Sequence, residues 1–207
     1  MTLPATQAAR LSDLRSSLQT AVPIALGQVG SERPDFSAGT VRIVWCPEAL
    51  LVRADLQDEE VFSRATGDSQ NFWEMGDVFE FFLEAGGAGY YTEMHVAPRN
   101  HRMHMQIRPE DFLSMKAGTL APADLMVRPP DFESRYEVVP GGWVAEAVVP
   151  AAVVQPGGKI SRDSCWRASF SRYDAGSDGR NPVLSSTSFH REKINFHARG
   201  DWRTICF

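Results

Sequence analysis

The sequence predicts an all-β sandwich that is preceded by a single N-terminal helix. From residue 40 onward, short segments with strand-like patterns follow one another, separated by turn residues at regular spacing. The sequence lacks the alternation of strands with long helical patterns that would indicate a parallel sheet. The chain has 207 residues, of which 43% are hydrophobic and 23% charged, so it can bury a sizeable core as a globular protein.

The first 39 residues have a different texture and are expected to form an appendage. Apolar residues recur there at helical spacing, which predicts an amphipathic helix over residues 6–21 that ends near Pro23. These residues are Leu11, Leu14, Leu18 and Val22. Glycine, serine and proline then mark residues 27–39 as a connector. The predicted organisation is therefore residues 1–39 as helix and connector, and residues 40–207 as the β-sandwich domain.

Ten segments are predicted as strands: residues 40–45, 50–56, 78–84, 90–97, 102–107, 125–128, 136–139, 143–149, 167–173 and 202–207. The first two flank Cys-Pro-Glu-Ala, which is expected to connect them as a hairpin. The third and fourth flank Ala-Gly-Gly-Ala-Gly, where glycine permits a positive φ. Gly141-Gly142 predicts another tight turn.

Charge and cysteine content argue against several classes of partner and location. The net charge is -5 without a run of lysine or arginine, and no apolar stretch is long enough to span a bilayer, so neither nucleic acid nor membrane is expected as a partner. The N-terminus lacks the pattern of a secretory signal, which predicts a cytoplasmic protein. Cys46, Cys165 and Cys206 are widely separated and have no CxxC spacing, so three thiols are expected, without a disulfide framework or structural zinc.

A candidate ligand site begins at Trp73, a few residues before a strand with two chemically different faces. Side chains alternate across a strand, so Glu80 shares one face with Val78 and Phe82. A carboxylate close to a tryptophan is a plausible start for a polar ligand site. The alternative is that Trp73 packs on the rim of the sheet while Glu80 faces water.

Two later strands also carry one polar or mixed face. One of these faces comprises Tyr91, Glu93, His95 and Ala97, and the other comprises Arg167, Ser169, Ser171 and Tyr173. If these strands are neighbours, their faces form a surface that is rich in hydrogen-bond donors and acceptors.

Other chemistries have weaker support. No nucleophile elbow, P-loop or dinucleotide fingerprint is present. Glu80 and Glu93 are a conceivable acid–base pair for glycoside cleavage, although no spacing sets their separation. Residues 55–60 contain four acidic residues, Asp55, Asp58, Glu59 and Glu60, which predict a solvated loop or, as the alternative, a calcium site.

A histidine- and methionine-rich segment lies at residues 101–105. His101, Met103 and Met105 alternate with His104 on a strand, so they cannot all bind one metal, and the methionines are expected in the core with the histidines on an open face. A haem held by one Met and one His from different strands is a further possibility. His190 and His197 lack a third ligand at regular spacing, so zinc is not predicted there.

Several segments between about residues 40 and 207 form an ordered set. The first two are Trp73 to Glu80 and Tyr91 to Pro98. They are followed by Trp-Val-Ala-Glu-Ala-Val-Val-Pro at 143–150, Trp-Arg-Ala-Ser-Phe-Ser-Arg at 166–172, Phe189-His190 and residues 202–207. Taken together and in this order, these segments resemble elements of family 9 carbohydrate-binding modules, which belong to the DOMON-like superfamily.

The resemblance implies a sandwich of two antiparallel sheets, of jelly-roll type, that acts as a non-catalytic module. It would hold a mono- or oligosaccharide on the concave sheet, with no resident cofactor, although calcium is possible. The sugar would lie between aromatic side chains and bind charged groups. The implied carbohydrate-binding residues are Trp73, Glu80, Tyr91, Glu93, His95, Arg167, Phe189 and His190.

Departures from the family pattern point to weaker sugar binding and leave two alternatives open. Ala97 and Ser169 stand where the family often has asparagine, His95 replaces a longer charged side chain, and Phe189 replaces a tryptophan. The first alternative is a haem b-binding electron-transfer domain of the DOMON type. The second is a protein-interaction module whose sugar site has decayed.

Overall fold

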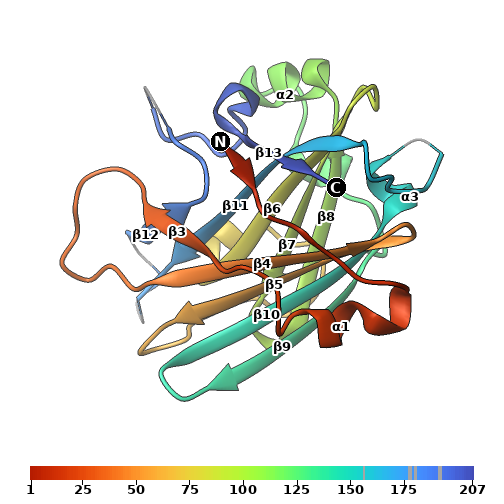
Figure 1. Cartoon of the computed structure of the whole chain (residues 1–207). Coiled ribbons are helices and arrows are strands. Elements are labelled where there is room, and N and C mark those ends of the chain that lie inside the picture. The colour runs from red at the N-terminus through yellow and green to blue at the C-terminus, as the bar shows by residue number, and fades with distance from the viewer. Residues whose placement is uncertain (156, 177–178, 180, 191–192) are drawn as a thin grey trace.

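The computed structural model describes residues 1–155, 157–176, 179, 181–190 and 193–207 (Figure 1). Strands dominate this part of the chain. They are β1 (Thr2–Leu3), β2 (Thr6–Gln7), β3 (Ile24–Gln28), β4 (Gly39–Cys46), β5 (Ala49–Gln57), β6 (Val78–Ala85), β7 (Tyr91–Ala97), β8 (His101–Ile107), β9 (Glu133–Val139), β10 (Gly142–Pro150), β11 (Cys165–Asp174), β12 (Val183–Ser186) and β13 (Arg203–Cys206). The α-helices are α1 (Leu14–Ser17), α2 (Pro109–Lys116) and α3 (Ala151–Val154). Short 3-10 turns cover Leu11–Asp13, Phe72–Glu74, Pro98–Asn100, Pro122–Leu125 and Arg199–Asp201.

The strands form one mainly antiparallel sheet that is nearly closed on itself. Its order is β8-β7-β6-β11-β12-β3-β4-β5-β10-β9, and β3 pairs with β12 on one side and β4 on the other. Two short pairs are parallel, β1 with β13 and β2 with β4. The N- and C-terminal strands therefore lie side by side, as Figure 1 shows. The expected all-β class is confirmed, and the closure is consistent with a sandwich.

The main apolar core contains one face of strands β4, β5, β6, β7, β10 and β11. Phe79, Phe81 and Leu83 of β6 are fully buried in it, as the alternation of the sequence predicts. Phe170 of β11 stacks on Phe79, with ring centroids 6.4 Å apart. Burial of each such side chain contributes about 1.5–3 kcal/mol to stability, so this face holds the sheet in register.

Most predicted strands are confirmed, including the two hairpins with short connections. Thr40 pairs with Asp55 in β4–β5, and Phe79 pairs with Val96 in β6–β7. In the second hairpin Gly87 has a φ of 77°, which is the conformation that glycine was expected to supply. The strand expected at residues 125–128 is wrong, because 122–125 form a 3-10 turn and Met126 makes only an isolated bridge.

The N-terminal helix expected over residues 6–21 is wrong in extent. Only Leu14–Ser17 is α-helical, after a 3-10 turn at Leu11–Asp13, and Thr6–Gln7 is strand. Leu14 packs on the outer face of β4 and β5, whereas Leu11 is 53% exposed. The first 39 residues also contribute β1, β2 and β3 to the sheet. The boundary between residues 39 and 40 stays a prediction.

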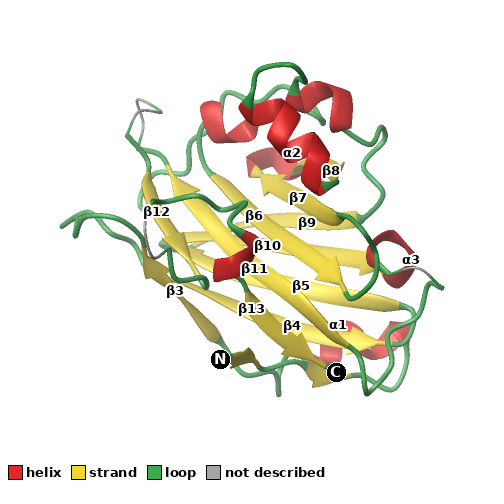
Figure 2. Cartoon of the chain, turned by 90° about the horizontal axis from the view of Figure 1, so that it is seen from above, coloured by secondary structure: helices red, strands yellow, loops and turns green. Residues whose placement is uncertain are grey.

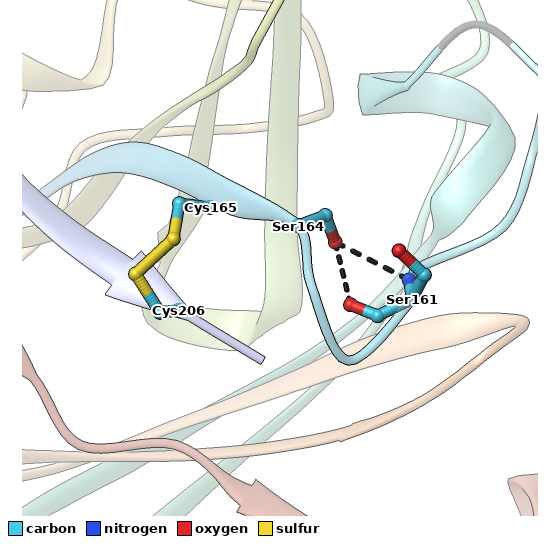
Figure 3. Close-up of a disulfide and its surroundings, with 4 residues drawn as sticks. All are labelled: Ser161, Ser164, Cys165 and Cys206. Carbon is cyan, nitrogen blue, oxygen red and sulfur yellow. Dashed lines mark hydrogen bonds between the residues drawn. A yellow bond between two sulfur atoms is a disulfide. The ribbon is translucent and has the colours of Figure 1, made fainter.

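The expectation of three thiols is wrong. Cys165 of β11 and Cys206 of β13 stand opposite each other in an antiparallel pair and form a disulfide, with Cα atoms 4.2 Å apart (Figure 3). The two cysteines are 41 residues apart in sequence, and no sequence motif indicates that they pair. Beside the bridge, the Ser164 hydroxyl donates a hydrogen bond of 2.7 Å to the Ser161 carbonyl oxygen. Cys46 is a buried thiol.

Two further expectations about polar residues are corrected by burial. The acidic segment after β5 is not simply solvated, because Asp58 is buried and accepts a hydrogen bond of 3.0 Å from the guanidinium of Arg172. Arg172 is itself fully buried and also lies 3.0 Å from Asp174. His104, expected on an open face, is fully buried, whereas Met103 is buried as expected.

None of the helices in the described part of the chain has the length and apolar character needed to cross a membrane.

Candidate functional site

The three two-faced strands of the sequence are direct neighbours in the sheet. β6 lies between β7 and β11, so Glu80 faces His95 on one side and Ser171 on the other. Phe82 likewise stands between Glu93 and Ser169. The polar faces therefore meet on one surface, opposite the main core.

A cavity of about 600 Å³ lies over this surface. Glu80, Glu93 and Tyr173 form polar parts of its lining, together with Met105 of β8. Helix α2, which follows β8 and lies at the top of Figure 1, covers one side with Phe112, Met115 and Lys116. Figure 2 shows α2 from above, next to β7 and β8. Trp73, Pro122, Leu184 and residues 193–197 complete the wall.

Trp73 reaches the cavity because the 3-10 turn before β6 is anchored by its neighbour Phe72. Phe72 is 1% exposed and belongs to a second apolar cluster under the cavity. The rings of Trp73 and His95 make a T-shaped contact, with centroids 5.7 Å apart and planes at 81°. Trp73 is partly exposed and lines the cavity, so its indole is an aromatic surface at the wall.

Glu80, Glu93 and His95 form a buried polar cluster on the floor. His95 Nε2 lies 2.8 Å from Glu93 Oε1 and 3.3 Å from Glu80 Oε1. All three side chains are at most 3% exposed. Burial, together with the nearby charge of Glu93, raises the pKa of Glu80 well above its usual range. Burial acts in the same direction on Glu93, yet His197 and His95 hold its pKa below the ordinary value.

His197 links this floor to the cover of the cavity. Its Nδ1 lies 2.9 Å from the Tyr91 hydroxyl and 3.6 Å from Glu93 Oε2. The ring of Phe112 from α2 stacks on the His197 ring at 5.0 Å and 30°. Burial and the charge of Glu93 raise the pKa of Tyr91, so its hydroxyl is a donor at neutral pH.

The predicted site residues divide into two groups. Trp73, Glu80 and Glu93 line the cavity, and His95 and Tyr91 contact the lining residues from below. The remaining three, Arg167, Phe189 and His190, do not line the cavity.

Each residue of the second group has another environment. Arg167 lies 2.7 Å from Glu84, at the edge of the same face. Phe189 is 68% exposed, and the guanidinium of Arg203 lies over its ring at 4.3 Å. His190 packs behind the cavity wall on Phe196, with ring centroids 5.2 Å apart, and burial lowers its pKa.

Several lining residues were not predicted from the sequence. Phe112, Met115 and Lys116 belong to α2, which was not predicted. A weak signal existed, because Pro109 follows Arg108 and Glu110-Asp111 begin the segment, as at a helix N-terminus. His197 was considered only as a zinc ligand. Asn195 and Phe196 come from an irregular segment, so no periodicity could assign them a direction.

Some of these groups could bind a metal or a cofactor. The ligand atoms of Glu80, Glu93 and His95 all lie within 4.8 Å of one another. The same holds for Asp58, Asp77 and Asp174. In that second cluster the Asp77 carboxylate already accepts backbone hydrogen bonds from residues 62 and 175.

Comparison with protein-family models gives no match for this sequence, and comparison with curated proteins gives no significant match. Comparison with solved structures, by contrast, finds the same fold. A protein from Bacteroides uniformis that is proposed to bind carbohydrate is similar with a TM-score of 0.77 and 15% identity, over 100% of this chain and 98% of that one.

Two further similar structures are of a family 9 carbohydrate-binding module from Caldicellulosiruptor kristjanssonii. The complex with glucose has a TM-score of 0.69 and 14% identity, over 100% of this chain and 95% of that one. The complex with cellotriose has a TM-score of 0.67 and 13% identity, over 98% of this chain and 91% of that one. The resemblance to family 9 modules is thus confirmed at the level of the fold.

Proposed function

We propose that this chain is a non-catalytic sugar-binding module that takes a mono- or oligosaccharide into the cavity over β7, β6 and β11. The observation that carries the proposal is that Trp73, Glu80 and Glu93 line one cavity. In this interpretation the nearly closed sheet is a two-sheet sandwich. Its concave sheet is β8-β7-β6-β11.

The chemistry of the lining suits a sugar. The C–H face of a pyranose packs on an aromatic ring, and Trp73 offers that ring at the wall. The hydroxyls need fixed polar partners. The carboxylate of Glu93 can accept charge-assisted hydrogen bonds from them, and the carboxyl group of Glu80 offers a further polar partner. Asn195 supplies an amide, which is the group type missing at Ala97 and Ser169. Apolar Met105 and Leu184 exclude water around these polar groups.

The structural neighbours support the proposal. The family 9 module with the same fold was solved in complex with glucose and with cellotriose. Glucose and cellotriose are therefore the first ligands to test. The cavity volume of about 600 Å³ lies within the range of small-molecule sites.

The test is calorimetric titration of the purified chain with glucose and cellotriose, extended by a glycan array. Trp73→Ala is expected to weaken binding by about 10- to 30-fold, because an aromatic anchor is lost. Glu93→Gln is expected to cost about 10-fold, because a charged acceptor becomes a neutral one. Phe189→Ala is the matched control, an exposed aromatic outside the cavity. Equal binding by wild type and Trp73→Ala, or a loss only in Phe189→Ala, would exclude this cavity as the site.

A haem b-binding domain is a second candidate because of one observation. Met105 and His197 come from different elements and both line the cavity, and a Met/His pair is a known haem ligand set. Haem binding predicts a Soret band after reconstitution with haemin. The band should be lost in Met105→Ala and kept in Met103→Leu, which alters a buried neighbour outside the lining.

A further inference from the structure

Three metal-ligand atoms converge at the floor of the cavity. His95 Nε2 lies 2.8 Å from Glu93 Oε1 and 3.3 Å from Glu80 Oε1, and the three atoms fit within 4.8 Å of one another. In a tetrahedral zinc site with bonds of about 2.0–2.1 Å, neighbouring ligand atoms are separated by roughly 3.3 Å. The two distances from His95 Nε2 lie within about 0.5 Å of that separation.

We propose that Glu80, Glu93 and His95 form a site for a divalent transition-metal ion, with Zn²⁺ as the best match, whose remaining coordination position faces the cavity. One imidazole nitrogen and two carboxylate oxygens are a ligand set that zinc accepts, and three protein ligands with one open position are typical of reactive zinc sites. Because Glu80 and Glu93 line the cavity, the open position is accessible to water or to a ligand oxygen.

A hydrogen-bond network alone leaves this cluster unsatisfied. His95 Nε2 can carry at most one proton and donate it to one carboxylate at a time, although both oxygens lie within 3.3 Å. Glu93 Oε2 is buried without a hydrogen-bond partner in the described part of the chain. Its nearest cationic candidate is His197 Nδ1, at 3.6 Å, which already pairs with the Tyr91 hydroxyl. Buried polar atoms without partners are rare in proteins and point to an unseen ligand.

Charge balance leads to the same inference. Two carboxyl groups that are at least 97% buried face one imidazole on the floor, and a divalent cation would neutralise both in their ionised form. Lys116 and Lys193 also line the cavity, but neither makes an ion pair with Glu80 or Glu93 among the described contacts. Metal binding would displace the proton from His95 Nε2, leaving Nδ1 protonated.

The site can be tested without any sugar, so its failure is separate from that of the proposed function. The full chain, stripped with a chelator and free of any histidine tag, is dialysed against Zn²⁺ and its metal content is measured by mass spectrometry. One Zn²⁺ per chain is expected, with at least 100-fold preference over Ca²⁺ and Mg²⁺ in calorimetry. Glu93→Gln and His95→Gln should each weaken binding by at least 10-fold.

Glu84→Gln is the matched control. This carboxylate lies on the same face of β6 but is held by Arg167 and Arg199, so its loss should leave Zn²⁺ affinity unchanged. Equal affinity of wild type and Glu93→Gln would overturn the proposal, as would a wild type that retains no Zn²⁺. Near-ultraviolet circular dichroism checks that each variant is folded.

If the variants do not fold, the wild type still decides the question. Co²⁺ substitution should give the intense visible bands of a four-coordinate site with nitrogen and oxygen ligands. A spectrum with a sulfur-to-cobalt charge-transfer band would instead assign the metal to Cys46, the buried thiol, and would overturn the proposal. Absence of visible bands would do so as well.

Discussion

His95 Nε2 and Glu93 Oε1 lie 2.8 Å apart although both residues belong to one strand and are separated by a single position. Alternation places them on the same face of β7, and burial removes water as a competing partner. Glu80 enters from the neighbouring strand, directly opposite His95. The contact between Glu93 and His95 follows from their spacing on one strand, whereas the approach of Glu80 depends on the pairing register of β6 with β7.

Loss of the imidazole should be costly for stability. His95→Leu removes the hydrogen-bond donor to Glu93 and leaves two buried carboxylates facing each other, so the free energy of unfolding is expected to fall by about 3 kcal/mol. Urea denaturation in the presence of a chelator measures the change. The double variant Glu93→Gln with His95→Leu should lose less than the sum of the single losses. Strict additivity would contradict this coupling.

His104 should make stability depend on pH. Burial lowers its pKa from the ordinary value near 6.5 to about 4, while the charge of Asp131 acts in the other direction. Between these two values the unfolded chain binds a proton that the folded chain does not, so stability falls as pH decreases from 6.5 to 4, by about 3 kcal/mol. Above pH 6.5 the effect is absent.

The measurement compares wild type with His104→Gln by denaturant titration at several pH values. The difference in unfolding free energy between the two proteins isolates the histidine from the carboxylates, which titrate in both. A difference that stays constant from pH 7 to pH 4 would contradict the prediction.

The Cys165–Cys206 disulfide should contribute substantially to stability. It closes a loop between residues 41 apart, for which the loss of chain entropy in the unfolded state corresponds to at most about 4 kcal/mol. Cys165→Ser with Cys206→Ser is expected to lower the unfolding free energy by about 2–4 kcal/mol, whereas Cys46→Ser leaves the bridge intact. A thiol assay should detect one thiol per chain after denaturation without reductant. Three thiols in protein from the native host would instead support the predicted cytoplasmic location, since disulfides persist mainly in oxidising compartments.

The cover of the cavity should affect ligand release more than folding. Phe112 stacks on His197 and lines the cavity, so Phe112→Ala opens the cover and is expected to weaken sugar binding about 10-fold, mainly through a faster dissociation rate. Its neighbour Leu113 is 65% exposed and outside the lining, so Leu113→Ala is the matched control. Calorimetry and stopped-flow fluorescence measure both variants. Equal dissociation rates would show that α2 does not retain the ligand.

Strand alternation was the part of the fold that the sequence revealed most directly. The opposite faces of β6, with Phe81 in the core and Glu80 at the cavity, follow from a period of two residues. The unpredicted β1 and β2 are two residues long, too short for a period to be recognised. At α1 the pattern misled in the opposite direction. The apolar spacing from Leu11 to Val22 is helical, but only the four residues Leu14–Ser17 form an α-helix.

The site was predictable where its residues lie on such strands or directly before one. Glu80 and Glu93 lie on β6 and β7, and Trp73 lies in the turn before β6. Phe112 and His197 come from a short helix and an irregular segment, where no repeat indicates direction. Phe189 shows the limit of a sequence resemblance, since it matches the family pattern but its exposed ring does not line the cavity.

The sequence by itself determined the all-β class, the two faces of each long strand and the carboxylates that face away from the core, because alternation depends only on the local backbone. The tertiary structure alone decided that β6 lies between β7 and β11, that Cys165 meets Cys206, and that α2 covers the polar face. These relationships depend on pairing and packing between residues far apart in the chain. Their free energy is gained only when the whole sheet has formed, so no local pattern encodes them.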